Sequence, residues 1–253
     1  MEIYALRCML WDLSVKQLKA KYASSLLGIF WALLNPLLIV AAVVFVFNAV
    51  FKIEIANFPF FALSGIFPWM FFSAALNEAT SSIINQQNIL RQFNLPSAIV
   101  PLSSVLSNFL NFLLGLSIIY PLFYLINPNI ILLLPFLVLV LLLNLIFTFG
   151  LGMLLAASNV FFRDVSRVLE VILMFWFWVT PVFYSVEMVP AKLCWVSNIN
   201  PMTPFILGFR KLIFDGRLPE AGVWAGVLLW ALISVVTGGF VFSRLEPKLL
   251  KRL

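Results

Sequence analysis

The chain has 253 residues, of which 63% are hydrophobic and only 10% are charged. A soluble domain is about a quarter charged and roughly half apolar, so the composition excludes an ordinary soluble protein. A membrane span takes about 20 residues, and six spans would use about half of the chain. The remainder is too short for a separate soluble domain of normal size, so any catalytic engine must lie on a partner.

The net charge of +6 comes from Lys and Arg residues that are spread thinly between long apolar runs. This distribution indicates membrane topology rather than nucleic-acid binding. The absence of histidine excludes imidazole metal sites and imidazole acid–base catalysis. Cys8 and Cys194 have no metal-ligand spacing, so we expect no metal site. The charged segment before the first apolar run favours an uncleaved signal anchor.

The long apolar runs predict an all-α, polytopic membrane protein, because spanning segments must satisfy their backbone groups internally. One uncharged stretch of about 70 residues is long enough for two spans, and Asn127-Pro128-Asn129 is its strong turn signal. We expect one transmembrane domain with six helices, at about 31–51, 61–82, 98–126, 130–157, 168–186 and 222–243.

Two further segments are expected to lie at membrane surfaces. Residues 1–28 carry two apolar stripes that change phase near Ser14, which predicts an interfacial amphipathic helix with a break there; a simple basic topology anchor is the alternative. Residues 187–221 predict an outer, gate-like helical hairpin at or dipping into the bilayer surface. In it, Thr203-Pro204 is typical of an N-cap with a first-turn proline, and Asp215-Gly216 of a helix end.

The positive residues predict the orientation. Eleven lie on the side of both termini: Arg7, Lys16, Lys19, Lys21, Arg91, Arg163, Arg167, Arg244, Lys248, Lys251 and Arg252. Five lie on the other side: Lys52, Lys192, Arg210, Lys211 and Arg217. This excess predicts a multi-pass protein of the cytoplasmic (inner) membrane with both termini and the tail 244–253 in the cytoplasm.

Four stretches carry a family resemblance: Lys21-Tyr22 through Ser25-Leu26-Leu27-Gly28 to Trp31 and Pro36; Gly65-Ile66-Phe67-Pro68-Trp69 with Phe71-Phe72; Asn159-Val160-Phe161-Phe162-Arg163-Asp164; and Thr180-Pro181-Val182 with Tyr184, followed by Asn200-Pro201-Met202-Thr203. In this order they resemble the permease subunit of ABC-2 type exporters of polysaccharides, such as O-antigen and teichoic acid. The resemblance spans nearly the whole chain.

The resemblance implies a coupling helix in the loop 83–96 that docks into an ATPase subunit. Its candidate residues are Asn88, Ile89, Leu90, Arg91, Phe93 and Pro96, joined by Arg163 and Asp164. Ile89, Leu90 and Phe93 are expected to form an exposed apolar stripe on a short surface helix, which a groove on a soluble partner would bury. The alternatives are a plain cytoplasmic loop and, for Arg163-Asp164, a local ion pair at a span end.

The chain contains no Gly-x-x-x-x-Gly-Lys-Ser/Thr sequence, so it does not cradle ATP phosphates. We therefore expect no enzyme activity and no cofactor on this chain, with ATP and Mg on a separate nucleotide-binding subunit. The resemblance implies two ATPase copies, a second copy of the permease, and a pore at the permease dimer interface.

The substrate implied by the resemblance is a lipid-linked, O-antigen-like polysaccharide. Sugar rings stack on aromatic planes, so Phe30, Trp31, Phe175, Trp178 and Tyr184 are hypothesised to line the path; placement at the membrane interface is the alternative. Lys16, Lys19 and Lys21 are the candidates for attracting a diphosphate head group.

Other functions remain open from the sequence. Within the same class, the chain could be an ABC-2 permease for teichoic acid, capsule, a drug or a lipid. An ion-driven secondary transporter would need charged relays at mid-membrane, which the expected spans lack. A membrane enzyme would need a clustered acid–base or metal constellation, which the sequence does not show.

Overall fold

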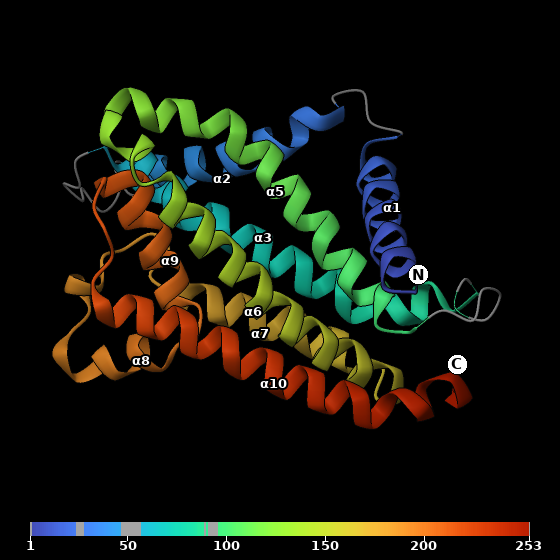
Figure 1. The fold of residues 1–253 in the computed structure, drawn as a ribbon. Coiled ribbons are helices and arrows are strands. Elements are labelled where there is room, and N and C mark those ends of the chain that lie inside the picture. Colours follow the sequence, from blue (N-terminus) through green and yellow to red (C-terminus); the bar gives the residue numbers. More distant parts are fainter. Residues whose placement is uncertain (1, 24–27, 47–56, 89, 91–95, 253) are drawn as a thin grey trace.

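The structure is a computed structural model that describes residues 2–23, 28–46, 57–88, 90 and 96–252. Within these residues all regular secondary structure is helical, without strands, which confirms the predicted all-α class (Figure 1). The expected first outer loop and part of the expected coupling loop lie outside the described residues.

The long elements are α1 (Glu2–Tyr22), α2 (Trp31–Val46), α3 (Phe58–Asn85), α5 (Ile99–Ile126), α6 (Leu134–Phe161), α7 (Val165–Val179) and α10 (Ala221–Arg252). Short turns η1 (Gly28–Phe30) and η3 (Pro128–Ile131) precede α2 and α6. Between α7 and α10 lie η4 (Val186–Met188), η5 (Ala191–Leu193), α8 (Cys194–Ile199), α9 (Thr203–Arg210) and the π-helical η6 (Lys211–Asp215).

Four of the described helices, α3, α5, α6 and α10, are long and apolar enough to cross a membrane. Helix α2 is described over 16 residues, and the end of its expected span, 47–51, lies outside the described residues. Helix α7 has 15 residues, which gives a length of about 22 Å against a hydrocarbon core of about 30 Å. Helix length alone therefore supports four spans.

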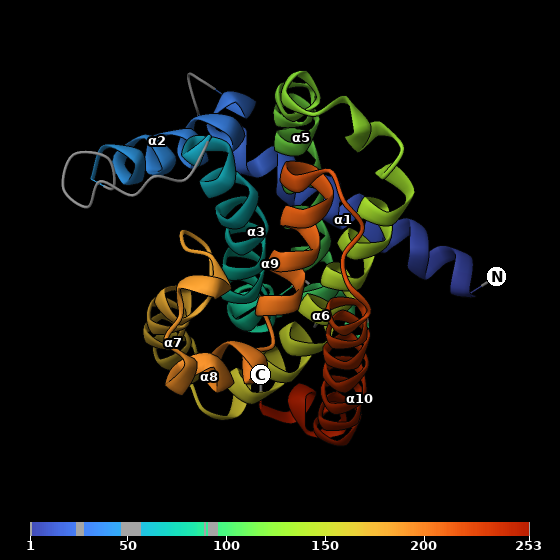
Figure 2. The same cartoon turned by 90° about the vertical axis from the view of Figure 1, so that its left-hand side faces the viewer.

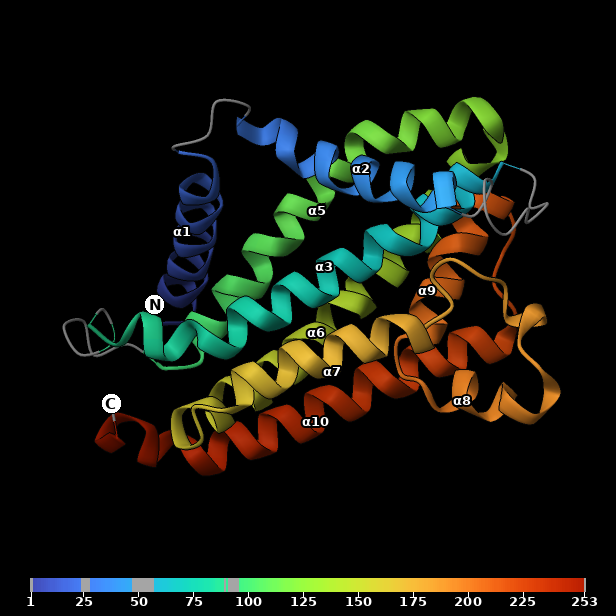
Figure 3. The same ribbon diagram turned by 180° about the vertical axis from the view of Figure 1, so that it is seen from behind.

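Helix α1 is continuous, so the predicted break at Ser14 is wrong. The Ser14 hydroxyl is buried and donates a hydrogen bond to the Leu10 carbonyl one turn earlier, at 2.6 Å. A serine can bond back in this way without leaving the helix. The helix lies crosswise to α3, α7 and α10 (Figure 3), an orientation consistent with the predicted interfacial position.

Helix α3 is the centre of the bundle. Seen end-on in Figure 2, it lies between α2 and α7 on one side and α5 and α6 on the other, with α9 beside it. Stacked aromatic rings join it to its neighbours: the ring centroids of Phe72 and Phe147 are 5.5 Å apart, and those of Phe147 and Phe205 are 4.8 Å apart. The core therefore runs from α3 through α6 to α9.

The two ends of the bundle differ. Both described termini, the end of α3, the start of α5 and the α6–α7 connection lie at one end, here called the terminal end (Figures 1 and 3). The segment from Thr180 to Glu220 lies at the opposite end, the hairpin end. The two described termini thus lie at the same end of the bundle.

Two predicted details of the hairpin end are wrong. The fifth span was expected over 168–186, but α7 ends at Val179 and the backbone becomes extended at Thr180, just before Pro181. This follows from the restriction that proline imposes on the preceding residue. Thr203 is the first residue of α9 rather than its N-cap, and its hydroxyl makes no cap hydrogen bond.

The predicted end of the hairpin helix is confirmed. Gly216 has a φ of 64°, the left-handed conformation in which helices commonly end. The Arg217 amide then donates to the Lys211 carbonyl at 2.9 Å, which closes the last turn.

Helices α6 and α10 approach each other closely through glycines. A Cβ atom at Gly150 would collide with the backbone of Ser234, and one at Gly238 would collide with the carbonyl of Gly150. Between membrane helices, close backbone approach at small residues replaces the hydrophobic driving force that acts in water.

Gly238→Ala is therefore expected to destabilise the chain by about 1–3 kcal/mol, because backbone atoms must move to admit the methyl group. The neighbouring Gly239→Ala is the control: no atom lies within 4 Å of its added Cβ, and alanine is the better helix former. Thermal unfolding of the two variants in detergent measures the difference. Equal melting temperatures would contradict the crossing.

Candidate functional site

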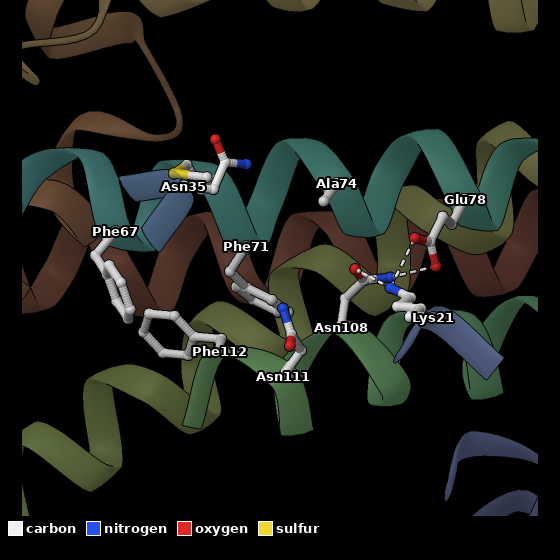
Figure 4. Close-up of a pocket in the computed structure, with 10 residues that line it drawn as sticks. Lys21, Asn35, Phe67, Phe71, Ala74, Glu78, Asn108, Asn111 and Phe112 are labelled. Atoms are coloured by element: carbon white, nitrogen blue, oxygen red, sulfur yellow. Dashed lines mark hydrogen bonds and ion pairs between the residues drawn. The ribbon is translucent and has the colours of Figure 1, made fainter. Parts of the chain in front are cut away.

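A polar pocket of about 200 Å³ lies beside the central helix, between α1, α2, α3 and α5 (Figure 4). Its lining is Lys21, Asn35, Phe67, Met70, Phe71, Ala74, Glu78, Asn108, Asn111 and Phe112. Figure 4 shows the phenylalanine rings at one end and the Lys21, Glu78 and Asn108 side chains at the other. The pocket thus combines an aromatic wall with a polar one.

The charged groups of the pocket are paired with each other. The Lys21 ammonium lies 2.7 Å from Glu78 Oε1 and donates to Asn108 Oδ1, also at 2.7 Å. The Asn108 amide donates in turn to Glu78 Oε2 at 2.7 Å and to the Ser104 carbonyl at 2.9 Å. One residue each from α1, α3 and α5 therefore forms a closed network without net charge.

Two more hydrogen bonds hold α1 on α5. The Gln17 amide donates to the Ser103 hydroxyl at 3.0 Å, and the Tyr22 hydroxyl donates to Asn111 Oδ1. Gln17 and Lys21 are four residues apart and so lie on one helix face. Helix α1 is therefore attached to the bundle by a polar face as well as by apolar contacts.

Lys21 had been predicted to act together with Lys16 and Lys19 on a lipid head group. Lys16 and Lys19 are exposed on α1, whereas Lys21 is occupied by Glu78. The structure therefore separates one lysine from the other two. No local pattern indicates this pairing, since 57 positions separate Lys21 from Glu78.

A second hollow, of about 490 Å³, lies on the other flank of α3, towards α7. It is lined by Ile39, Ile66, Trp69, Met70, Ser73, Glu170, Leu173, Met174 and Phe177, and it shares Met70 with the polar pocket. This hollow is mostly apolar and aromatic, with Glu170 at its edge.

At the hairpin end, Arg210 is buried, with 4% of its surface exposed. Its guanidinium donates to the Ser64 hydroxyl at 3.2 Å and to the Val182 carbonyl at 2.5 Å, with a longer contact of 3.5 Å to the Tyr184 carbonyl. It also lies 3.9 Å from the centroid of the Phe61 ring. One side chain thus joins α9 to α3 and to the segment after α7.

The Arg210 guanidinium is charged at neutral pH, as arginine is in folded proteins. Gly65 leaves the room that this cation needs, because a Cβ there would meet the Val182 carbonyl and would lie 2.6 Å from the guanidinium. The room that Arg210 needs thus explains the glycine of the Gly65–Trp69 motif.

In the sequence, Arg210 counted only among the positive residues of the outer side. The signal for its buried role was its position beside the apolar stripe of α9.

The five aromatic residues predicted to line a path do not meet in one cavity. Phe30 and Trp31 are exposed at the start of α2, and Phe175 and Trp178 are exposed on α7. Tyr184 is half-buried, and its hydroxyl donates to the Val179 carbonyl at 2.9 Å. A substrate path along these exposed residues would need a second protein surface opposite them.

The predicted coupling residues lie at the terminal end where they are described. Asn88, Pro96, Arg163 and Asp164 are exposed. The expected exposure of Leu90 is wrong: it is 1% exposed and belongs to a small core with Ile83, Val100, Ala156, Ala157, Phe242 and Leu249. The end of α10 folds over it, so Leu90 holds its own chain together. Ile89, Arg91 and Phe93 lie outside the described residues.

Asn159 fixes the α6–α7 connection to α3. Its amide donates to the Thr80 carbonyl at 3.0 Å, and its side-chain oxygen accepts from the Ser166 amide at 3.2 Å. In the described part of the chain, ion pairs join Lys21 to Glu78 and Lys211 to Glu220. Arg163 and Asp164 form no such pair with another described residue.

Arg210→Met is expected to destabilise the chain, because buried carbonyls lose their donor at about 1–3 kcal/mol for each group left unpaired. Arg217→Met is the matched control, since Arg217 is exposed and its loss should change stability by no more than about 0.5 kcal/mol. Thermal unfolding of both variants decides the matter. An equal effect would show that Arg210 does not anchor α9.

Comparison with known proteins gives the family. Residues 10–214 match the ABC-2 type transporter family. The chain is 32% identical over 236 residues to the O-antigen export system permease protein RfbA of Klebsiella pneumoniae, covering 91% of this chain and 89% of that protein. It is also 32% identical over 251 residues to the protein of the same name from Myxococcus xanthus, covering 92% and 93%. The chain therefore belongs to the ABC-2 type transporter family.

Proposed function

We propose that this chain is the permease subunit of an ATP-driven exporter that moves a lipid-linked polysaccharide across the cytoplasmic membrane. The observation that carries the proposal is the match along about nine-tenths of the chain to permeases named for O-antigen export. The multi-pass helical fold supports it, since four described helices are of spanning length.

The proposed topology has six spans, with α2 and α7 as the shorter ones. Helix α7 stops short of the length of the hydrocarbon core, and α9 packs against α3, α6 and α10 at the hairpin end. The hairpin would therefore complete the outer half of the membrane region beside α7. Both termini lie at one end of the bundle, which the excess of positive residues assigns to the cytoplasm.

The family implies an ATPase partner, and the terminal end is the surface proposed for it. The end of α3, the start of α5 and the α6–α7 connection lie there together, and Asn159 ties the α6–α7 connection to the end of α3. A partner that presses on Arg163 and Asp164 would thus act directly on α3. Nucleotide binding would shift the permease only as far as it favours one arrangement over another.

Two copies of the chain are proposed to enclose the path. Phe175 and Trp178 lie on the surface of α7, and Phe30 and Trp31 lie at the start of α2. In one copy they face outwards, so a second copy would supply the opposite wall. Lys16 and Lys19, which are exposed on α1, are the lysines that we assign to the diphosphate head group.

Deletion of the gene for this chain is expected to abolish surface polysaccharide and to leave lipid-linked polymer inside the cell. Re-expression of the chain together with its ATPase should restore export, and the ATPase alone should not. Immunoblots of surface and intracellular glycan measure both. Unchanged surface polysaccharide after deletion would refute the proposed function.

Arg163→Ala combined with Asp164→Ala is expected to lower export at least tenfold, because both side chains are exposed at the proposed docking surface. Lys248→Ala, an exposed residue near the same end on α10, is the control and should export normally. Export is compared at equal membrane levels of the proteins, with ATPase activity measured in proteoliposomes. Normal export and normal ATPase activity in the double variant would place the docking surface elsewhere.

A further inference from the structure

The polar pocket beside α3 has hydrogen-bonding groups that the described part of the chain leaves unused. Asn35 lies within the otherwise apolar helix α2 and makes no hydrogen bond to another described residue. Asn111 accepts from Tyr22 with its oxygen, while its amide nitrogen has no partner among the described groups. Asn35 is exposed and Asn111 is partly exposed, so both amides are open to water or to a polar ligand in the pocket.

The charge of the pocket limits the ligand. Lys21 and Glu78 are its charged residues, and they cancel each other at 2.7 Å. A phosphate would have to displace Glu78 from Lys21 and would then lie next to the released carboxylate, which repels it. The pocket therefore disfavours an anion and suits an uncharged polar group.

The aromatic wall of the pocket narrows the class of ligand further. Phe67, Phe71 and Phe112 belong to the buried core, and the parts that reach the pocket form a continuous aromatic cluster, with ring centroids 5.3 Å apart for Phe67 and Phe112 and 5.4 Å apart for Phe71 and Phe112. A sugar ring has apolar C–H faces that lie against such rings and hydroxyl groups at its edge that bond amides and carboxylates. An uncharged sugar ring therefore matches both walls of the pocket.

We infer that this pocket binds an uncharged sugar ring of the exported glycan, and that the diphosphate of the lipid carrier binds elsewhere. The inference rests on the proposed function and adds a substrate site to it. Asn35 and Asn111 bond ring hydroxyls, and the phenylalanine cluster carries the ring face. The Lys21–Glu78 pair keeps anions out.

The test uses the complete permease–ATPase complex in nanodiscs and two separate probes. One probe is radiolabelled glycan, freed from its lipid by mild acid; the other is radiolabelled polyprenyl diphosphate without sugar. The wild-type complex is expected to bind both without competition between them. Competition between the two probes, or binding of the diphosphate alone, would overturn the inference.

Asn35→Leu is the informative variant, because Asn35 supports no hydrogen bond of the fold in the described residues. We expect it to weaken glycan binding about tenfold and to leave diphosphate binding unchanged. Asn198→Leu, an exposed amide on α8, is the matched control and should bind both probes like the wild type. Unchanged glycan binding in Asn35→Leu would overturn the inference.

Glu78→Gln tests the role of the ion pair by freeing the charge of Lys21. We expect this variant to gain a second, pocket-bound diphosphate that competes with the glycan, which the wild type does not show. Absence of this competition in Glu78→Gln would contradict the exclusion of anions.

Export by the wild-type complex is measured in parallel. Absence of export refutes the proposed function, whereas normal export together with failed binding predictions refutes only the pocket assignment.

Discussion

The fold depends on satisfying polar groups around a helix that is buried on almost every side. Helix α3 is held at three levels by side chains from other elements: Arg210 at the hairpin end, Lys21 with Asn108 along its length, and Asn159 at the terminal end. A polar group without a partner costs several kcal/mol in hydrocarbon. Each partner therefore fixes the position of its own helix against α3.

This constraint connects the proposed functional surfaces. Asn159 bonds the backbone of α3 near its terminal end, and Glu78 lies on the same helix where the polar pocket opens. Further along, Ser64 receives the guanidinium that anchors the hairpin. One rigid helix thus passes the proposed docking surface, the pocket and the hairpin in turn. That arrangement would give the proposed ATPase on one side a physical route to the opposite side.

The sequence was enough for the parts of the fold that depend on local patterns. Long uncharged runs located α3, α5, α6 and α10, and Asn127-Pro128-Asn129 located the turn between two of them, where the Asn127 side chain accepts from the Asn129 amide at 3.2 Å. Gly216 ended the hairpin helix as expected. Such features need only neighbouring residues, so a sequence displays them directly.

The features that sequence reasoning missed come from distant pairs. Lys21 and Arg210 were counted as topology charges, because nothing near them in the chain shows that Glu78 and Ser64 will meet them. Leu90 was expected on a partner, although the end of α10 covers it. Each of these residues has a side chain that suits its predicted role as well as its observed one. Only the packing of helices that are distant in the sequence shows which of the two roles it has.

Helices in lipid associate through close backbone packing or through hydrogen bonds, and the chain uses the two kinds of contact in different places. Helices α6 and α10 meet at Gly150 and Gly238, where close backbone contact leaves no room for side chains. Helix α1 instead meets α5 through hydrogen bonds, and a hollow of about 320 Å³ remains between their apolar residues. Close backbone contact cannot be loosened without losing many atomic contacts at once, whereas a few hydrogen bonds can be exchanged for bonds to water or ligand at small net cost. The polar pocket lies beside the contact between α1 and α5, where helices associate through exchangeable hydrogen bonds.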